Sequence, residues 1–63
     1  MNEIYKKLKD ILKKNGVYYV RNGKGDHEIW GDGKRTFSID KNGKSRHTAN
    51  AALAFFGIKE KIK

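Results

Sequence analysis

The sequence predicts an α+β domain with the element order α-β-β-β-α. Three observations predict this class: an amphipathic helical period at the start, three short segments rich in β-branched and aromatic residues joined by glycine turns, and a second helical period near the end. Two helices on one face of a three-stranded antiparallel sheet would bury both apolar stripes in one core. With 63 residues, the chain is expected to form a single domain, 1–63.

The first helix is predicted over residues 2–15. Its apolar residues recur on one face of a helical period, and lysines occupy most of the remaining positions. These apolar residues are Ile4, Leu8, Ile11 and Leu12. Gly16 follows, and glycine is the residue that most readily adopts the left-handed backbone just past a helix end.

The three strands are predicted over residues 17–21, 27–30 and 35–40, with turns at 22–25 and 31–33. β-branched and aromatic residues favour extended backbone, and the glycines in both connections favour tight turns. Links this short join antiparallel neighbours, so the strands are expected to form a meander.

The second helix is predicted from about 48 to 56, after a basic loop at 41–47. The residues expected on its buried face are Ala49, Ala52, Leu53 and Phe56. Gly57 is expected to end this helix, and the tail 59–63 is expected to fray.

Composition excludes several classes of function. Without cysteine there is no disulfide framework, thiolate metal site or thiol nucleophile. No apolar run approaches the ~18 residues that cross a bilayer, and the start lacks the apolar stretch of a secretory signal, so no membrane partner and a cytoplasmic location are expected. The net charge of +8 favours a polyanionic partner such as nucleic acid. Residues 34–47 alone carry five basic side chains against one acidic one.

Three segments follow one another in an order and spacing typical of one protein family. The first helix runs into KKNGVYYVRN, the second strand begins at Gly25-Asp26-His27, and the chain closes with SRHTANAALAFFGI. Together they resemble the HicA-type mRNA interferase toxins of type II toxin–antitoxin systems, over nearly the whole chain. Two departures are Asp26, where many relatives have serine or glycine, and the absence of proline before the last helix.

The resemblance implies a fold similar to the double-stranded RNA-binding domain. It also implies cleavage of mRNA without a ribosome or cofactor, and inhibition by a HicB-type antitoxin protein. On this basis His27 is the expected catalytic residue.

His27 suits RNA cleavage because RNA carries its own nucleophile, the ribose 2′-hydroxyl. An imidazole with the ordinary pKa of ~6.5 can take the hydroxyl proton or donate a proton to the leaving oxygen, and the sequence leaves both roles open. Lys24 and Arg35 are candidates to neutralise the transition-state charge, and Gly25 lets backbone approach a phosphate. The alternative is a histidine that only forms surface hydrogen bonds. Asp26 and Glu28 flank His27 but would face the opposite side of a strand, so no metal site is expected.

The segment before the second helix is the other candidate RNA contact. Lys44, Arg46 and His47 are predicted to bind phosphates there, since a helix N-terminus attracts anions. The alternative is an ordinary helix cap, solvated and closed by Ser45 or Thr48.

The aromatic residues Tyr18, Tyr19 and Trp30 can either pack in the core or stack on unpaired bases. Because alternate strand residues face opposite sides, at least one of the two tyrosines is expected on the sheet surface.

The sequence therefore favours a metal-independent endoribonuclease toxin that uses His27. A competing hypothesis is a non-catalytic RNA-binding module of the same fold, in which His27 is one contact among several. A third is a degenerate toxin that only binds its antitoxin.

Overall fold

The structure is a computed structural model that describes residues 3–43 and 45–63. It confirms the predicted α+β class and element order, and each element ends within one or two residues of its predicted bounds. In order, the elements are α1 (Glu3–Lys14), β1 (Tyr18–Asn22), β2 (His27–Gly31), β3 (Thr36–Asp40) and α2 (Arg46–Phe55).

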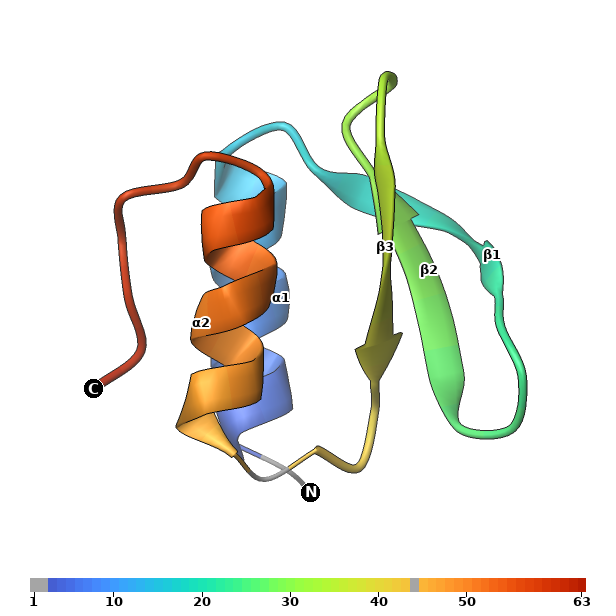
Figure 1. The fold of residues 1–63 in the computed structure, drawn as a ribbon, viewed down its shortest axis with the longest axis horizontal. Helices are drawn as coiled ribbons and strands as arrows, with labels where there is room; N and C mark the ends of the chain where they lie inside the picture. Colours follow the sequence, from blue (N-terminus) through green and yellow to red (C-terminus); the bar gives the residue numbers. More distant parts are fainter. Residues whose placement is uncertain (1–2, 44) are drawn as a thin grey trace.

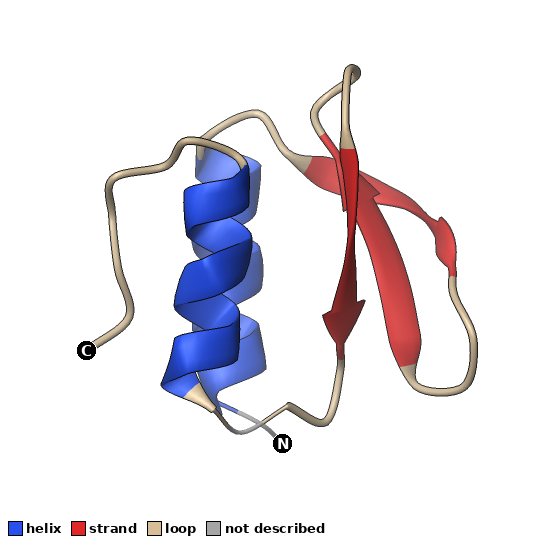
Figure 2. Cartoon of the chain, in the orientation of Figure 1, coloured by secondary structure: helices blue, strands red, loops and turns tan. Residues whose placement is uncertain are grey.

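The molecule has two layers, a pair of helices and a three-stranded antiparallel sheet. The helices lie side by side on one face of the sheet (Figure 1 and Figure 2). The strand order is β1-β2-β3, and β1 is the strand furthest from the helices (Figure 1). Every residue of β1 is exposed, so the helices bury mainly β2 and β3. The face without helices is called the open face below.

The apolar stripe of α1 forms as predicted. Leu8, Ile11 and Leu12 are buried, and Ile4 packs at the margin of the same core. The helix ends in a hydrogen-bonded reversal in which Val17 N donates to Leu12 O at 2.9 Å, with Gly16 at a φ of 81°. This cap turns the chain from the helical layer into the sheet.

The start of α2 lies two residues earlier than predicted. The helix begins at Arg46 because Ser45 caps it, with extended backbone and a side-chain oxygen that accepts from Thr48 N at 3.4 Å. Arg46 and His47 therefore belong to the first helical turn, not to a loop. The expected buried face is present, with Ala49, Ala52 and Leu53 buried and Phe56 at its margin.

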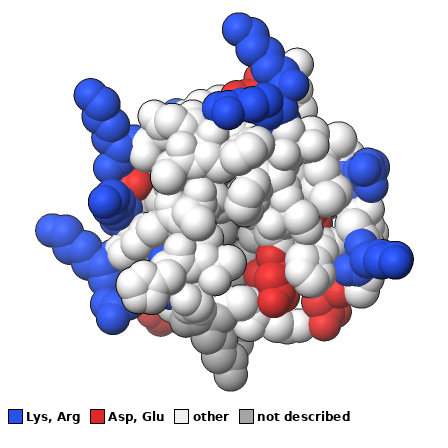
Figure 3. All heavy atoms as spheres, viewed as in Figure 1, with Lys and Arg blue, Asp and Glu red and all other residues white. Residues whose placement is uncertain are grey.

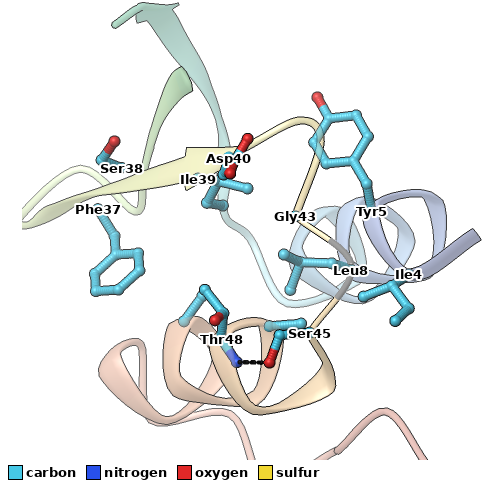
Figure 4. A pocket seen from close by; sticks show the side chains of 12 residues that line it. Ile4, Tyr5, Leu8, Phe37, Ser38, Ile39, Asp40, Gly43, Ser45 and Thr48 are labelled. Carbon is cyan, nitrogen blue, oxygen red and sulfur yellow. Dashed lines mark hydrogen bonds between the residues drawn. The ribbon is translucent and has the colours of Figure 1, made fainter. Parts of the chain in front are cut away.

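The two faces of the sheet follow from strand alternation. Trp30 and Ile39 are 2% and 4% exposed beneath the helices, so Trp30 belongs to the core. Figure 4 shows Phe37 pointing toward α2 and Ser38 pointing to the opposite side. The alternate residues of β2 and β3 therefore form the open face: His27, Ile29, Gly31, Thr36, Ser38 and Asp40.

A β-bulge interrupts the pairing of β1 with β2. Tyr19 pairs with Trp30 and Arg21 pairs with Ile29, which leaves Val20 as the extra residue. The shift places Arg21 beside Ile29 on the open face. Both tyrosines of β1 are exposed, Tyr18 at 52% and Tyr19 at 45%, so neither is a core residue.

The expected fraying of the tail is wrong. Ile62 is only 6% exposed and belongs to the core. The side chain of Asn50 on α2 holds it from both sides, because Asn50 Nδ2 donates to Ile62 O at 3.0 Å and Ile62 N donates to Asn50 Oδ1 at 2.8 Å. Lys14 and Glu60 add an exposed ion pair of 3.6 Å.

Candidate functional site

A tight turn between β1 and β2 carries His27. The turn spans Lys24 to His27, and His27 N donates to Lys24 O at 3.1 Å. Gly25, the second residue of the turn, has a φ of 59°, a backbone conformation that residues other than glycine rarely adopt. Gly23 N donates to His27 O at 2.8 Å and closes the base of the turn. Lys24, Gly25 and His27 thus belong to one turn, which lies two residues later than the predicted turn at 22–25.

The imidazole of His27 is exposed on the open face, and one of its nitrogens has a partner. Nδ1 lies 3.1 Å from the carbonyl oxygen of Lys24. A carbonyl oxygen only accepts hydrogen bonds, so in the neutral ring this contact favours the tautomer with its proton on Nδ1. Nε2 then keeps its lone pair and can accept a proton.

Asp40 lies opposite His27 across the β2–β3 pair. Residues paired in this way on antiparallel strands have Cβ atoms about 5 Å apart, so Asp40 is the neighbour of His27 on β3. Asn42 N donates to Asp40 Oδ1 at 2.9 Å and holds the carboxylate at the strand end. The sequence analysis missed Asp40, because only the register of the hairpin pairs it with His27.

The turn after β3 is fastened to the turn that carries His27. Asn42 Nδ2 donates to Asp26 Oδ2 at 2.7 Å, and Lys41 N donates to Asp26 O at 2.9 Å. These two bonds join segments that lie far apart in the sequence. Asp26 therefore links the two turns in this chain.

Glu28, which follows His27 in β2, faces the helices. Glu28 accepts hydrogen bonds from the hydroxyl of Tyr5 on α1 and from Trp30 Nε1, the latter at 3.1 Å. Burial disfavours the charged form of Glu28, but these bonds and the nearby charges of Lys41 and Lys9 outweigh it and lower the pKa of the carboxyl. The pKa of Tyr5 is raised by burial and by its bond to the charged Glu28.

The start of α2 lies at the same end of the molecule as the His27 turn (Figure 1). Arg46 and His47 are both exposed in its first turn. The Ser45 cap predicted as the alternative is present, and it leaves both side chains free to meet solvent or a phosphate. Lys44, the third predicted contact of this segment, lies outside the described residues.

Arg35 lies far from His27, contrary to its predicted role beside the catalytic residue. It follows the other end of β2, and Gly31 lies four positions beyond His27 along the strand, a span of about 13 Å. Its Nη2 donates to Phe55 O at 2.6 Å and its guanidinium lies 4.6 Å from the Phe55 ring centroid. Arg35 thus closes the C-terminal end of α2.

Arg21 takes a position that the sequence did not predict. The bulge at Val20 brings it to the open face, on the edge strand β1 beside Ile29. Its side chain is exposed. In the view of Figure 3, Lys and Arg side chains project from the rim of the molecule and its centre is uncharged.

The hollow between the layers is too small to be a substrate site. It has a volume of about 20 Å³, room for little more than one water molecule, and Ile4, Leu8, Phe37 and Ile39 are among its lining residues (Figure 4). His27 does not line it. The candidate site is therefore the open face, not an interior cavity.

Two further properties concern residues 3–43 and 45–63. No group of three or more His, Asp or Glu side chains is placed to hold a metal ion. Of the helices in these segments, none has the length and apolar character needed to span a membrane. Comparisons with protein-family models, with curated proteins and with solved structures found no match to this chain.

Proposed function

We propose that this protein is an endoribonuclease of the HicA toxin type, which cleaves single-stranded mRNA with His27 as the general base. One observation carries the proposal. His27 stands exposed on the open face with Nδ1 bonded to a backbone carbonyl, which leaves Nε2 available to a ribose hydroxyl. The sequence resemblance described above identifies the same histidine independently.

The reaction needs only groups that the protein and RNA supply. Nε2 of His27 takes the proton from the 2′-hydroxyl, and the 2′-oxygen attacks the adjoining phosphorus. The bond from phosphorus to the 5′-oxygen breaks, and that oxygen takes a proton from water. The products are a 2′,3′-cyclic phosphate and a 5′-hydroxyl end, and His27 returns its proton to solvent.

Nearby cations support the developing negative charge. Lys24 belongs to the same turn as His27, and Arg21 lies along the open face from it. Arg46 and His47 lie at the start of α2, in the helical layer, so they would meet a phosphate only where the RNA strand runs past the end of the sheet. Arg35 has no part in the chemical step, because it lies at the opposite end of the sheet.

An acidic protein inhibitor completes the proposal. The net charge of +8 would steer a HicB-type antitoxin of opposite charge to this surface. Cleavage of mRNA would take place in the cytoplasm.

The test is cleavage of a labelled single-stranded RNA by the wild type, His27→Ala and His47→Ala in the presence of a chelator. His47→Ala is the comparison variant, because it removes an exposed histidine that the proposal assigns to phosphate binding and not to proton transfer. We expect His27→Ala to lose at least a hundredfold in rate, in line with the usual share of general base catalysis of ~10²–10⁴. His47→Ala should lose much less.

Product analysis separates the proposal from its competitors. A 2′-deoxy substitution at the cleaved nucleotide should block the reaction, and the wild-type products should carry 2′,3′-cyclic phosphate. Binding of RNA without cleavage by any form would indicate the non-catalytic RNA-binding module. Equal cleavage by the wild type and His27→Ala would show that His27 is not the base.

A further inference from the structure

A second hollow lies on the open face, at the opposite end from His27. It has a volume of about 230 Å³. Tyr18 and Val20 of β1 line it, together with Gly31 at the end of β2 and Lys34 in the turn that follows. Tyr18 and Val20 are among the most exposed large apolar side chains of the described segments, at 52% and 44%.

The floor of this hollow is backbone. A Cβ atom at Gly31 would lie 2.9 Å from Arg35 O and 3.3 Å from Val20 Cγ2, so only glycine fits. Gly33 has a φ of 94°, and a Cβ atom there would lie 3.5 Å from the hydroxyl of Tyr18. Gly31 and Gly33 thus leave backbone at the floor of the hollow, and the side chains of Val20 and Thr36 border it. A flat group can approach the exposed ring of Tyr18 there.

The lining fits one nucleobase with an attached phosphate. An aromatic ring offers a stacking surface to any base, and an exposed ammonium beside it can pair with a phosphate. No carboxylate lines the hollow. Its volume is below the range of about 300–1,000 Å³ usual for sites of whole small-molecule ligands, which favours a single ring system. Lys34 supplies the cation, since the guanidinium of Arg35 is turned toward Phe55.

The hollow and His27 lie on one continuous surface. Gly31 and His27 face the same side of β2 about 13 Å apart, and Arg21 lies between them beside Ile29. A single strand that crosses the open face would meet the hollow, then a cation, then the imidazole. This span corresponds to a few nucleotides of RNA.

We infer that the hollow formed by Tyr18, Gly31 and Lys34 is a nucleobase subsite that anchors single-stranded RNA a few nucleotides away from the bond cleaved at His27. The inference rests on the proposed function for its substrate, but its test does not require cleavage. Tyr18 and Lys34 act as binding residues here and take no part in the proton transfer.

The test measures binding of labelled oligouridylates of increasing length, all in the His27→Ala background. We expect affinity to rise at the length that first reaches from His27 to the hollow. Tyr18→Ala should lower the affinity of these longer strands by roughly five- to 150-fold, the usual value of one base–aromatic stack, and leave the dinucleotide unaffected. Tyr18→Phe should retain the affinity, because it keeps the ring.

Tyr19→Ala is the matched control, since it removes the same side chain from the neighbouring residue on the helix-facing side. A second control is an abasic nucleotide moved along the RNA. At the nucleotide that stacks on Tyr18, the abasic change and Tyr18→Ala combined should lower the affinity no more than either change alone, because both remove the same stack. Lys34→Ala, an exposed turn variant, tests the phosphate contact should Tyr18→Ala fail to fold.

Several outcomes would overturn the inference. Equal effects of Tyr18→Ala and Tyr19→Ala, or no abasic position coupled to Tyr18, would remove the subsite. RNA binding unchanged in Tyr18→Ala, with loss of binding to an inhibitor protein, would assign the hollow to a protein interface. If wild-type protein cleaves nothing yet shows this coupling, the subsite stands and only the nuclease proposal fails.

Discussion

The hydroxyl of Tyr5 on α1 donates a hydrogen bond to the carboxylate of Glu28 on β2, directly behind His27. The same carboxylate accepts from the buried Trp30. This polar link joins the two layers of the fold at the strand end that carries the candidate catalytic residue. Its two ionisable members have pKa values shifted in opposite directions, so it gives the stability of the protein a defined dependence on pH.

The acid side of that dependence comes from Glu28. Its pKa in the folded state lies below the ordinary 4.5, so its contribution to stability is fully present above pH 4.5 and is lost as the pH falls through the folded value. We expect Glu28→Gln to be less stable than the wild type near neutral pH and to lose less stability on acidification. Urea unfolding followed by Trp30 fluorescence measures both. Parallel pH curves for the two proteins would contradict this assignment.

The alkaline side comes from Tyr5. Its pKa is raised above the ordinary 10.0, so the folded state favours the neutral phenol and stability falls as the pH rises above 10.0. Tyr5→Phe should cost about 1 kcal/mol near neutral pH through the lost hydrogen bond. It should also remove this part of the alkaline loss. The check is the difference in unfolding free energy between Tyr5→Phe and wild type across the alkaline range, which should shrink.

Asn42 is expected to position the His27 turn through its bond to Asp26. Asn42→Ala should lower kcat for RNA cleavage by roughly ten- to a hundredfold, since small displacements of a catalytic group are costly, while KM changes little. The NMR shifts of the His27 ring nitrogens should change as well. A fall in thermal stability with kcat retained would mean that the bond serves only the fold.

Asn50 is expected to hold the C-terminal tail. Asn50→Ala removes both bonds to Ile62 and should expose the tail to proteolysis and to faster amide exchange, with a melting temperature lower by several degrees. Asn50→Asp is the informative comparison, because it keeps the acceptor for Ile62 N and loses only the donor. Unchanged exchange at Ile62 in both variants would show that packing alone fixes the tail.

Arg35 is expected to contribute to stability through α2. Arg35→Ala loses a hydrogen bond to Phe55 O and a cation–π contact with the same residue, both exposed, and should cost about 1 kcal/mol. Arg35→Lys should recover only part, because an ammonium cannot reproduce the planar stacking. Thermal unfolding of the three proteins is the measurement. If Arg35→Lys is as stable as the wild type, the positive charge alone accounts for the contribution of Arg35.

The sequence predicted those features that depend on neighbours along the chain. The buried positions Leu8 and Leu12 of α1 follow from a helical period, and Gly16 and Gly57 end their helices because each adopts a left-handed backbone. The turn at Gly25 was predicted for the same reason. These are local properties, and nothing distant in the sequence competes with them.

Features that depend on register or on distant partners were not predictable. The bulge at Val20 decides which side of the sheet carries Arg21, and the β2–β3 pairing decides that Asp40 stands beside His27. The tail 59–63 was expected to fray as a chain terminus, and the burial of Ile62 was missed because its partner, Asn50, lies on the preceding helix. Arg35 was assigned to the His27 site because of its charge, whereas the length of β2 puts it at the other end of the sheet.

The outer edge of β1 makes the tendency of the protein to aggregate depend on the salt concentration. The strand is exposed throughout, and β2 pairs with only one of its sides. At low ionic strength, repulsion between molecules of charge +8 keeps these edges apart. Concentrated salt screens that repulsion, and the kink at Val20 with Arg21 beside it is then the remaining obstacle to sheet-to-sheet aggregation.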